Sequence, residues 1–139
     1  MKEPVWVLRE VVYALHERLL SEFGGAAGVR DDGMLESALS RPASQFAHDP
    51  PSMPELAAVY AFGLVCNHPF MDGNKRVGFA TAVLFLELNG YRFTASEVDA
   101  TVRTLALAAH DLDEAGYAAW LAANSKPIKA RSRGRKRLG

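Results

Sequence analysis

One stretch of this chain decides how it folds and where its chemistry lies: His68-Pro69-Phe70-Met71-Asp72-Gly73-Asn74-Lys75-Arg76. This motif places an imidazole, a carboxylate, an amide and two cations within a few residues of one another. The residues that follow, 77–88, are almost wholly apolar. A polar loop that leads directly into a buried helix predicts an anion-binding site at the start of that helix.

Outward from the motif, apolar periodicity predicts six helices and little strand. Asp32 is the expected N-cap of the second helix, which should stop before Pro42, and Ser96 is the expected N-cap of the fifth. Residues 43–53 read as a surface loop or flap, and 91–94 as an extended segment. The helices are expected at about 8–23, 34–39, 54–66, 74–88, 97 onward and 113–124.

Helix 74–88 is apolar on nearly every side, so the other helices should pack around it. The sequence therefore predicts an all-α fold with a central buried helix directly after the motif. We expect one domain over residues 1–125. Residues 126–139 are basic, small and polar after Pro127, and we expect them to be a disordered tail.

Charge is unevenly distributed along the chain. Residues 1–125 carry nine basic and sixteen acidic side chains, a net charge of −7, whereas the tail holds seven basic residues and no acid. The tail could contact nucleic acid, but it lacks interleaved aromatic residues, which favours a solvated tail. We expect no membrane contact and no secretory signal. The single cysteine, Cys66, fits a buried thiol in the reducing cytoplasm.

Two cations in the motif run against helix electrostatics. Lys75 and Arg76 fall in the first turn of the predicted helix, where the positive pole of the helix dipole disfavours cations by about 0.3–1 kcal/mol each. Their presence is explained if an anion, such as a phosphate chain, occupies this point. A surface salt bridge to an acid is the structural alternative.

The other motif residues also have a functional and a structural interpretation. His68 could take a proton from an incoming hydroxyl, or it could be a structural hydrogen-bonding residue. Asp72 could hold Mg²⁺ against phosphate oxygens, or cap the helix. Gly73 could allow close approach of a ligand, or only form the turn. Asn74 could bind a phosphate oxygen, or cap the helix. Phe70 is expected to anchor the loop in the core.

The motif resembles the signature of the Fic/Doc family: histidine, any residue, phenylalanine, any residue, an acid, a small residue, asparagine. Typical Fic enzymes, which transfer AMP, continue with glycine and arginine and carry a second arginine three residues later. This chain has Lys75 in place of that glycine, then Arg76, and Phe79 in place of the second arginine. It is therefore similar to the Doc branch, the death-on-curing toxins.

The resemblance covers roughly residues 6–124, through flanking stretches that include 24–31, 35–42 and 84–90. It implies a Fic/Doc fold and a toxin of a type II toxin–antitoxin pair. Such a toxin is a protein kinase that transfers the γ-phosphate of ATP to a threonine of elongation factor Tu and so blocks translation. On this sequence it implies His68 as general base, Asp72 as the Mg²⁺ ligand, and Gly73, Asn74, Lys75 and Arg76 as the phosphate-binding residues.

Two departures leave alternatives open. Doc proteins typically have alanine where this chain has Gly73, so AMP transfer to a protein hydroxyl is a second candidate function. A nucleotide-binding module without catalytic activity is a third. Many Fic enzymes also carry a self-inhibiting segment in which glutamate precedes glycine or asparagine, and no glutamate here does so. The resemblance therefore implies restraint by a separate Phd-like antitoxin.

Overall fold

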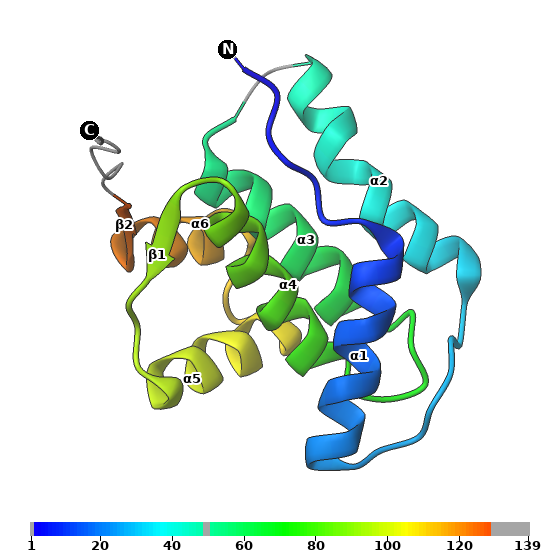
Figure 1. Cartoon of the computed structure of the whole chain (residues 1–139). Helices are drawn as coiled ribbons and strands as arrows, with labels where there is room; N and C mark the ends of the chain where they lie inside the picture. The colour runs from blue at the N-terminus through cyan, green and yellow to red at the C-terminus, as the bar shows by residue number, and fades with distance from the viewer. Residues whose placement is uncertain (1, 49–50, 129–139) are drawn as a thin grey trace, which may run out of the picture.

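The computed structural model describes residues 2–48 and 51–128, and in these residues the fold is helical, as predicted. Six helices and one two-stranded sheet follow one another along the chain (Figure 1). The elements are α1 Arg9–Phe23, α2 Asp32–His48, α3 Met53–Asn67, α4 Asn74–Leu88, β1 Tyr91–Phe93, α5 Glu97–Ala108, α6 Glu114–Ala123 and β2 Ser125–Pro127.

The centre of the fold is the pair of consecutive helices α3 and α4, which pack against each other. Helices α1 and α2 lie on one side of this pair and α5 and α6 on the other (Figure 1). Helix α4 is buried along most of its length, as the sequence predicts, but α3 is buried more completely. Small side chains make this possible. A Cβ atom at Gly78 of α4 would lie 2.5 Å from Cγ2 of Val65 in α3, and one at Gly63 would lie 2.8 Å from the Cβ of Ala38 in α2.

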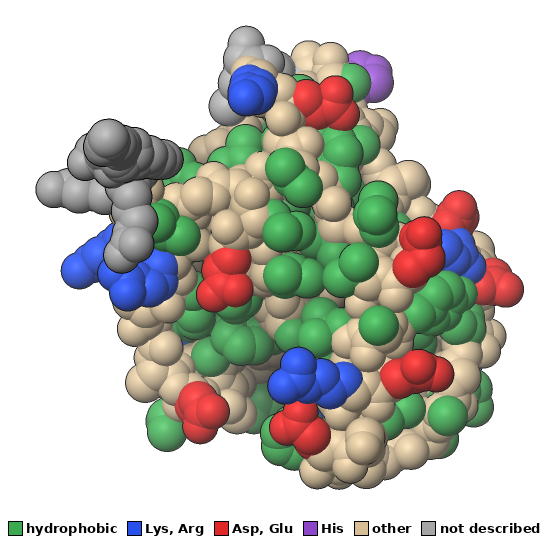
Figure 2. All heavy atoms as spheres, in the orientation of Figure 1, with side chains coloured by type: hydrophobic (Ala, Val, Ile, Leu, Met, Phe, Trp, Pro, Cys, Tyr) green, Lys and Arg blue, Asp and Glu red, His purple; other side chains and the backbone are tan. Residues whose placement is uncertain are grey.

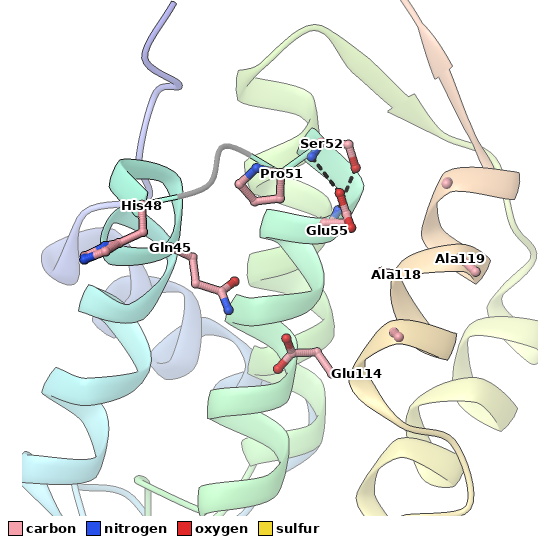
Figure 3. A pocket seen from close by; sticks show the side chains of 10 residues that line it. Gln45, His48, Pro51, Ser52, Glu55, Glu114, Ala118 and Ala119 are labelled. Atoms are coloured by element: carbon pink, nitrogen blue, oxygen red, sulfur yellow. Dashed lines mark hydrogen bonds between the residues drawn. The ribbon is translucent and has the colours of Figure 1, made fainter. Parts of the chain in front are cut away.

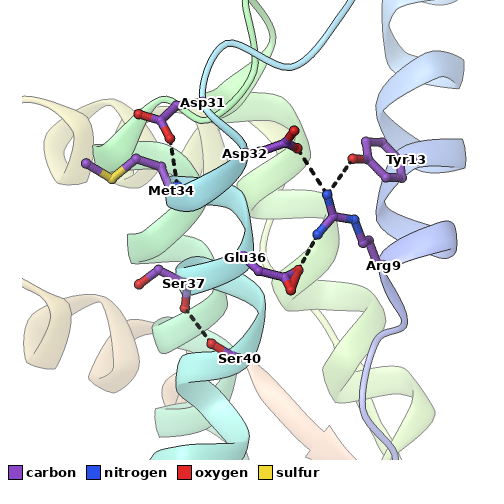
Figure 4. Close-up of polar contacts among 8 residues, drawn as sticks. All are labelled: Arg9, Tyr13, Asp31, Asp32, Met34, Glu36, Ser37 and Ser40. Atoms are coloured by element: carbon purple, nitrogen blue, oxygen red, sulfur yellow. Dashed lines mark hydrogen bonds and ion pairs between the residues drawn. The ribbon is translucent and has the colours of Figure 1, made fainter.

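Most helix starts are set by local capping. Ser52 and Glu55 form a capping box at α3, and the side chains of Ser96 and Asp113 accept backbone N–H groups at the starts of α5 and α6. At α2 the prediction was one residue out: Oδ1 of Asp31, not of Asp32, accepts the N–H of Met34 at 3.0 Å (Figure 4).

Helix α2 corrects two other predictions. It does not stop before Pro42 but continues to His48, so residues 43–48 are helical and form no flap. Leu35, Ala38, Pro42 and Phe46 lie at helical spacing on the side that packs against the core, and Phe46 meets the ring of Trp6 edge-on at 5.8 Å. Burial of this face outweighs the hydrogen bond that a proline removes from a helix.

Arg9 ties α1 to α2 on the outside of the molecule (Figure 4). Its guanidinium donates to Oη of Tyr13 at 2.9 Å, to Oδ1 of Asp32 at 3.1 Å and to Glu36. The connection between these helices is thereby held at its α2 end.

The predicted extended segment is strand β1, which pairs antiparallel with β2 in the register Tyr91–Pro127, Arg92–Lys126 and Phe93–Ser125. Lys126 and Pro127, placed in the tail by the sequence, thus pair with the domain. The rest of the predicted tail, from residue 129, lies outside the described residues. Among the helices described, none has the length and apolar character needed to cross a membrane.

We predict that Gly78→Ala destabilises the fold by about 1–3 kcal/mol, because the added methyl group has no room beside Val65. Urea unfolding followed by circular dichroism measures this change. The matched control is Gly33→Ala, an exposed helical position where the added Cβ would lie 3.3 Å from Oδ1 of the Asp31 side chain and alanine favours the helix by up to about 1 kcal/mol. Equal stability of the two variants would contradict close packing of α3 on α4.

Candidate active site

The motif loop, residues 68–73, joins α3 to α4 and is anchored by Phe70. The Phe70 side chain is buried, as predicted, and its ring stacks on that of His16 with centroids 3.8 Å apart. Nε2 of His16 donates a hydrogen bond to the backbone oxygen of Asp72 at 2.7 Å. His16 therefore supports the loop from α1 through both its ring face and its edge.

His16 lies far from the motif in the sequence, and its role was not predicted from the sequence. The available signal was its position on α1, one turn after Val12, which is also buried. A polar residue on the buried face of a helix requires a partner, and the partner here is the motif loop.

Asn74 holds the loop from within. Its Oδ1 accepts the backbone N–H of Phe70 at 2.9 Å and its Nδ2 donates to the backbone oxygen of Phe70 at 3.1 Å. The side chain is buried and closes the loop on itself. Neither Asn74 nor Asp72 caps α4 with its side chain: Gly73 is the N-cap, at φ 77°, without a side-chain capping bond.

The first turn of α4 therefore presents backbone N–H groups that no side chain of the described residues caps. Lys75 and Arg76 are exposed beside them and form no ion pair with any acid in the part of the chain that the structure describes. The salt-bridge alternative for these cations is thus not observed there. The guanidinium of Arg76 instead lies over the ring of Phe23, 4.4 Å from its centroid.

These groups border a hollow of about 740 Å³ between the end of α1, the first turn of α4 and α5. Five of the six predicted site residues line it: Asp72, Gly73, Asn74, Lys75 and Arg76. The lining also contains apolar side chains, among them Leu19 and Phe23 of α1 and Leu105 of α5, and the carboxylate of Glu97. Cations and apolar side chains in the lining of one hollow suit a ligand that carries both a phosphate chain and an apolar ring system.

Asp72 lies at the rim of the hollow with an exposed carboxylate. Its Oδ2 accepts the N–H of Ala26 at 3.2 Å and its Oδ1 accepts the N–H of Gly73 at 3.1 Å. The backbone comes this close because residue 25 is glycine: a Cβ there would lie 3.1 Å from Oδ2. Carboxylate lone pairs remain for a cation. The described residues contain no cluster of three potential metal ligands, so a metal ion here would share one carboxylate with phosphate and water.

His68 is not among the residues that line the hollow. It ends α3 in the left-handed conformation, at φ 50° and ψ 55°, and its side chain is exposed. The structure thus brings the phosphate-binding candidates and Asp72 to one hollow, and places His68 at the opposite end of the motif loop. The imidazole of His68 is exposed there, where a second macromolecule can reach it.

A second hollow of about 680 Å³ lies between the end of α2, the start of α3 and α6 (Figure 3). Its charged lining is acidic, from Glu55 and Glu114, and its wall on α6 consists of alanines. Glu114 is held by Arg41 through two hydrogen bonds of 2.7 and 3.1 Å. No Lys or Arg of the described residues lines this hollow, so its two carboxylates repel polyphosphate, whereas Lys75 and Arg76 oppose Asp72 and Glu97 in the hollow beside the motif. The hollow beside the motif is therefore the better phosphate site.

Cys66 is half-buried, with its Sγ 3.6 Å from the backbone oxygen of Leu107. Burial raises the pKa of its thiol, and the negative charge of Glu114 raises it further. A raised pKa lowers the thiolate fraction at neutral pH, so the structural role expected for Cys66 fits its surroundings.

Comparisons with a family model and with known proteins point to the same family. Residues 6–86 match the model of the Fic/DOC family. The chain is 41% identical over 75 residues to Toxin Doc of Mycolicibacterium smegmatis, which covers 52% of this chain and 58% of that protein. It is 34% identical over 82 residues to Protein kinase doc of Escherichia phage P1, which covers 58% of this chain and 65% of that protein. The matches thus span less than two thirds of either relative.

We predict that Asn74→Ala lowers the free energy of unfolding by about 1–3 kcal/mol, because it leaves the buried backbone N–H of Phe70 without a partner. Asn74→Asp keeps the acceptor for this N–H but loses the donor to the carbonyl oxygen, so it should also destabilise. Urea unfolding of both variants measures the effect. Unfolding free energies equal to that of the wild type would show that the side chain is not needed to close the loop.

Proposed function

We propose, from the premise that this chain belongs to the Fic/DOC family, that it is the toxin of a type II toxin–antitoxin pair and transfers the γ-phosphate of ATP to a protein hydroxyl. One observation carries the proposal: two cations without an acidic partner in the described residues stand beside an uncapped helix N-terminus, at the edge of a hollow of about 740 Å³. Phosphoryl transfer depends mainly on positioning and on charge neutralisation, and this arrangement suits both.

Each motif residue has a proposed task. The first-turn N–H groups of α4, with Lys75 and Arg76, would hold the phosphate chain, and Gly73 and Asn74 would keep these groups in place. Asp72 would hold Mg²⁺, which supplies charge neutralisation on the phosphate oxygens. His68 would take the proton from the target hydroxyl as this oxygen attacks the γ-phosphorus. The proton ends on the imidazole and ADP leaves.

The resemblance to Doc proteins points to a threonine of elongation factor Tu as the acceptor, and hence to an activity in the cytoplasm and to blocked translation. The name of the phage relative, Protein kinase doc, supports the kinase assignment. In this chain Lys75 replaces the glycine that AMP-transferring Fic enzymes carry at that position, which favours γ-phosphate transfer.

AMP transfer is the second candidate, and Gly73 is the residue that favours it. Its backbone offers another explanation for this glycine. At φ 77° a glycine is the least strained residue, and a Cβ there would lie 3.4 Å from Nε2 of His16. Gly73 therefore has a conformational reason to be glycine, which weakens it as an argument for AMP chemistry.

We predict that the purified protein, with ATP and Mg²⁺, adds one phosphoryl group to elongation factor Tu, and that His68→Ala abolishes the transfer without loss of stability because the side chain is exposed. Intact-protein mass spectrometry of the target measures the product. The matched control is His110→Ala, which removes another exposed histidine with a left-handed backbone, at φ 63°, outside the motif.

Two outcomes would favour another candidate function, and a third would contradict the role of His68. Addition of an AMP group to the target would replace the kinase assignment with the second candidate. ATP binding without transfer to any protein would favour the nucleotide-binding module without activity. Growth arrest on expression that persists in His68→Ala would contradict the role of His68.

We also propose that a Phd-like antitoxin covers the site by placing an amphipathic helix over exposed apolar residues next to the hollow. Val98, Val102 and Leu105 lie at helical spacing on α5 and are 74%, 57% and 51% exposed, and Phe23 across the hollow is 57% exposed. Apolar side chains are visible among basic and acidic groups on the face shown in Figure 2. An amphipathic helix that folds on binding buries such a stripe.

We predict that Val102→Glu stays toxic when an antitoxin that suppresses the wild-type growth arrest is co-expressed, because a carboxylate in the stripe blocks burial of the helix. The matched control is Leu88→Glu, a similarly exposed residue at the far end of α4, which should still be neutralised. Full neutralisation of Val102→Glu would exclude this stripe as the antitoxin surface.

A further inference from the structure

The connection between α1 and α2 runs alongside the motif loop and pairs with it through the backbone. The N–H of Met71 donates to the oxygen of Gly28 at 2.9 Å, and the N–H of Arg30 donates to the oxygen of Pro69 at 2.7 Å. Val29 and Phe70 lie opposite each other as an antiparallel bridge. Two segments far apart in sequence thus form a short ladder, and residue 30 is fixed next to the start of the motif loop.

From this position the side chain of Arg30 reaches the C-terminal end of α3. Its Nε donates to the backbone oxygen of His68 at 2.6 Å and its Nη2 donates to the backbone oxygen of Asn67 at 2.9 Å. These oxygens belong to the last turn of α3, where carbonyl groups lack helical partners and the helix dipole is negative. Arg30 makes no ion pair with an acid among the described residues, so its charge is directed at this helix end.

His68 depends on such support more than most residues would. Its φ of 50° lies in the left-handed region that residues with a Cβ rarely adopt. Among the described residues, the backbone oxygen of His68 accepts a hydrogen bond, whereas its imidazole forms none. The backbone therefore sets the direction in which the side chain leaves the turn, and among the described residues Arg30 is the only side chain that hydrogen-bonds the His68 backbone.

We infer that Arg30 is a positioning residue for His68. Its two hydrogen bonds hold Asn67 and His68 in the turn that aims the imidazole outward, towards the hydroxyl of a docked protein. The inference rests on the proposed function in one respect, the role of His68 as the base. Arg30 itself touches neither nucleotide nor acceptor and acts only through the backbone of His68.

The first test is independent of activity. Carbon and nitrogen chemical shifts of Asn67 and His68 are measured by NMR in the wild type, in Arg30→Gln and in Arg41→Gln. Arg41 is the matched control, because it also makes two hydrogen bonds through its guanidinium, but to Glu114 and away from the motif. We expect the His68 signals to shift and broaden in Arg30→Gln only, while those of His16 and Asn74 stay in place.

The second test measures phosphoryl transfer from ATP to elongation factor Tu. We expect kcat to fall about ten- to a hundredfold in Arg30→Gln, with the KM for ATP unchanged, because the phosphate site lies at the other end of the loop. Arg30→Lys, which keeps the charge and can reach one carbonyl oxygen, should recover part of kcat. Arg41→Gln should keep the wild-type kcat.

Unchanged His68 signals in Arg30→Gln would overturn the inference, and so would displaced signals with an unaffected kcat. If Arg30→Gln does not fold, the same two measurements on Arg30→Lys decide, with smaller displacement and a smaller fall in kcat expected. A wild type that transfers no phosphoryl group would refute the proposed function instead, and the NMR comparison would still decide whether Arg30 anchors His68.

Discussion

The close approach of α3 and α4 is the constraint on which the rest of the structure depends. Gly78 allows α4 to lie directly against Val65 of α3, at a distance that excludes even one methyl group. The motif loop is the short connection between these two buried helices. Its ends are therefore fixed by the core, and the position of the first turn of α4 follows from packing.

The loop is then held by contacts from its surroundings. His16 supports it from α1, Asn74 closes it internally, and the α1–α2 connection pairs with it along one edge. These contacts leave Lys75 and Arg76 free of acidic partners within the described residues, at a helix end where cations are unfavourable. A stability cost of this kind at a rigidly held site supports the proposed anion-binding role of these two residues.

Local features explain what the sequence could predict. The bounds of α4 and the cap Ser96 depend on neighbours a few residues away, and periodicity and capping chemistry locate them. Membership of the Fic/DOC family was likewise visible in the motif. The helix through Pro42 was missed because burial of its packed face decides it. Here the spacing of Leu35, Ala38, Pro42 and Phe46 was a usable signal.

Long-range contacts explain what the sequence could not predict. His16 lies 56 residues from Asp72, and Arg30 lies 38 residues from His68. No local pattern encodes such pairs. The same reason hid the fact that His68 does not line the hollow, since a compact motif in sequence does not require its side chains to face one cavity.

The most direct test of the central claim, that the first turn of α4 is a preformed phosphate site, is a titration with Mg²⁺ and ATP followed by the backbone amide signals in NMR. The account predicts saturable shifts concentrated at residues 73–77 and at Ala26, which contacts Asp72, with little change around Glu55 and Glu114 in the second hollow. Saturable binding that shifts the second hollow and leaves residues 73–77 unchanged would contradict it.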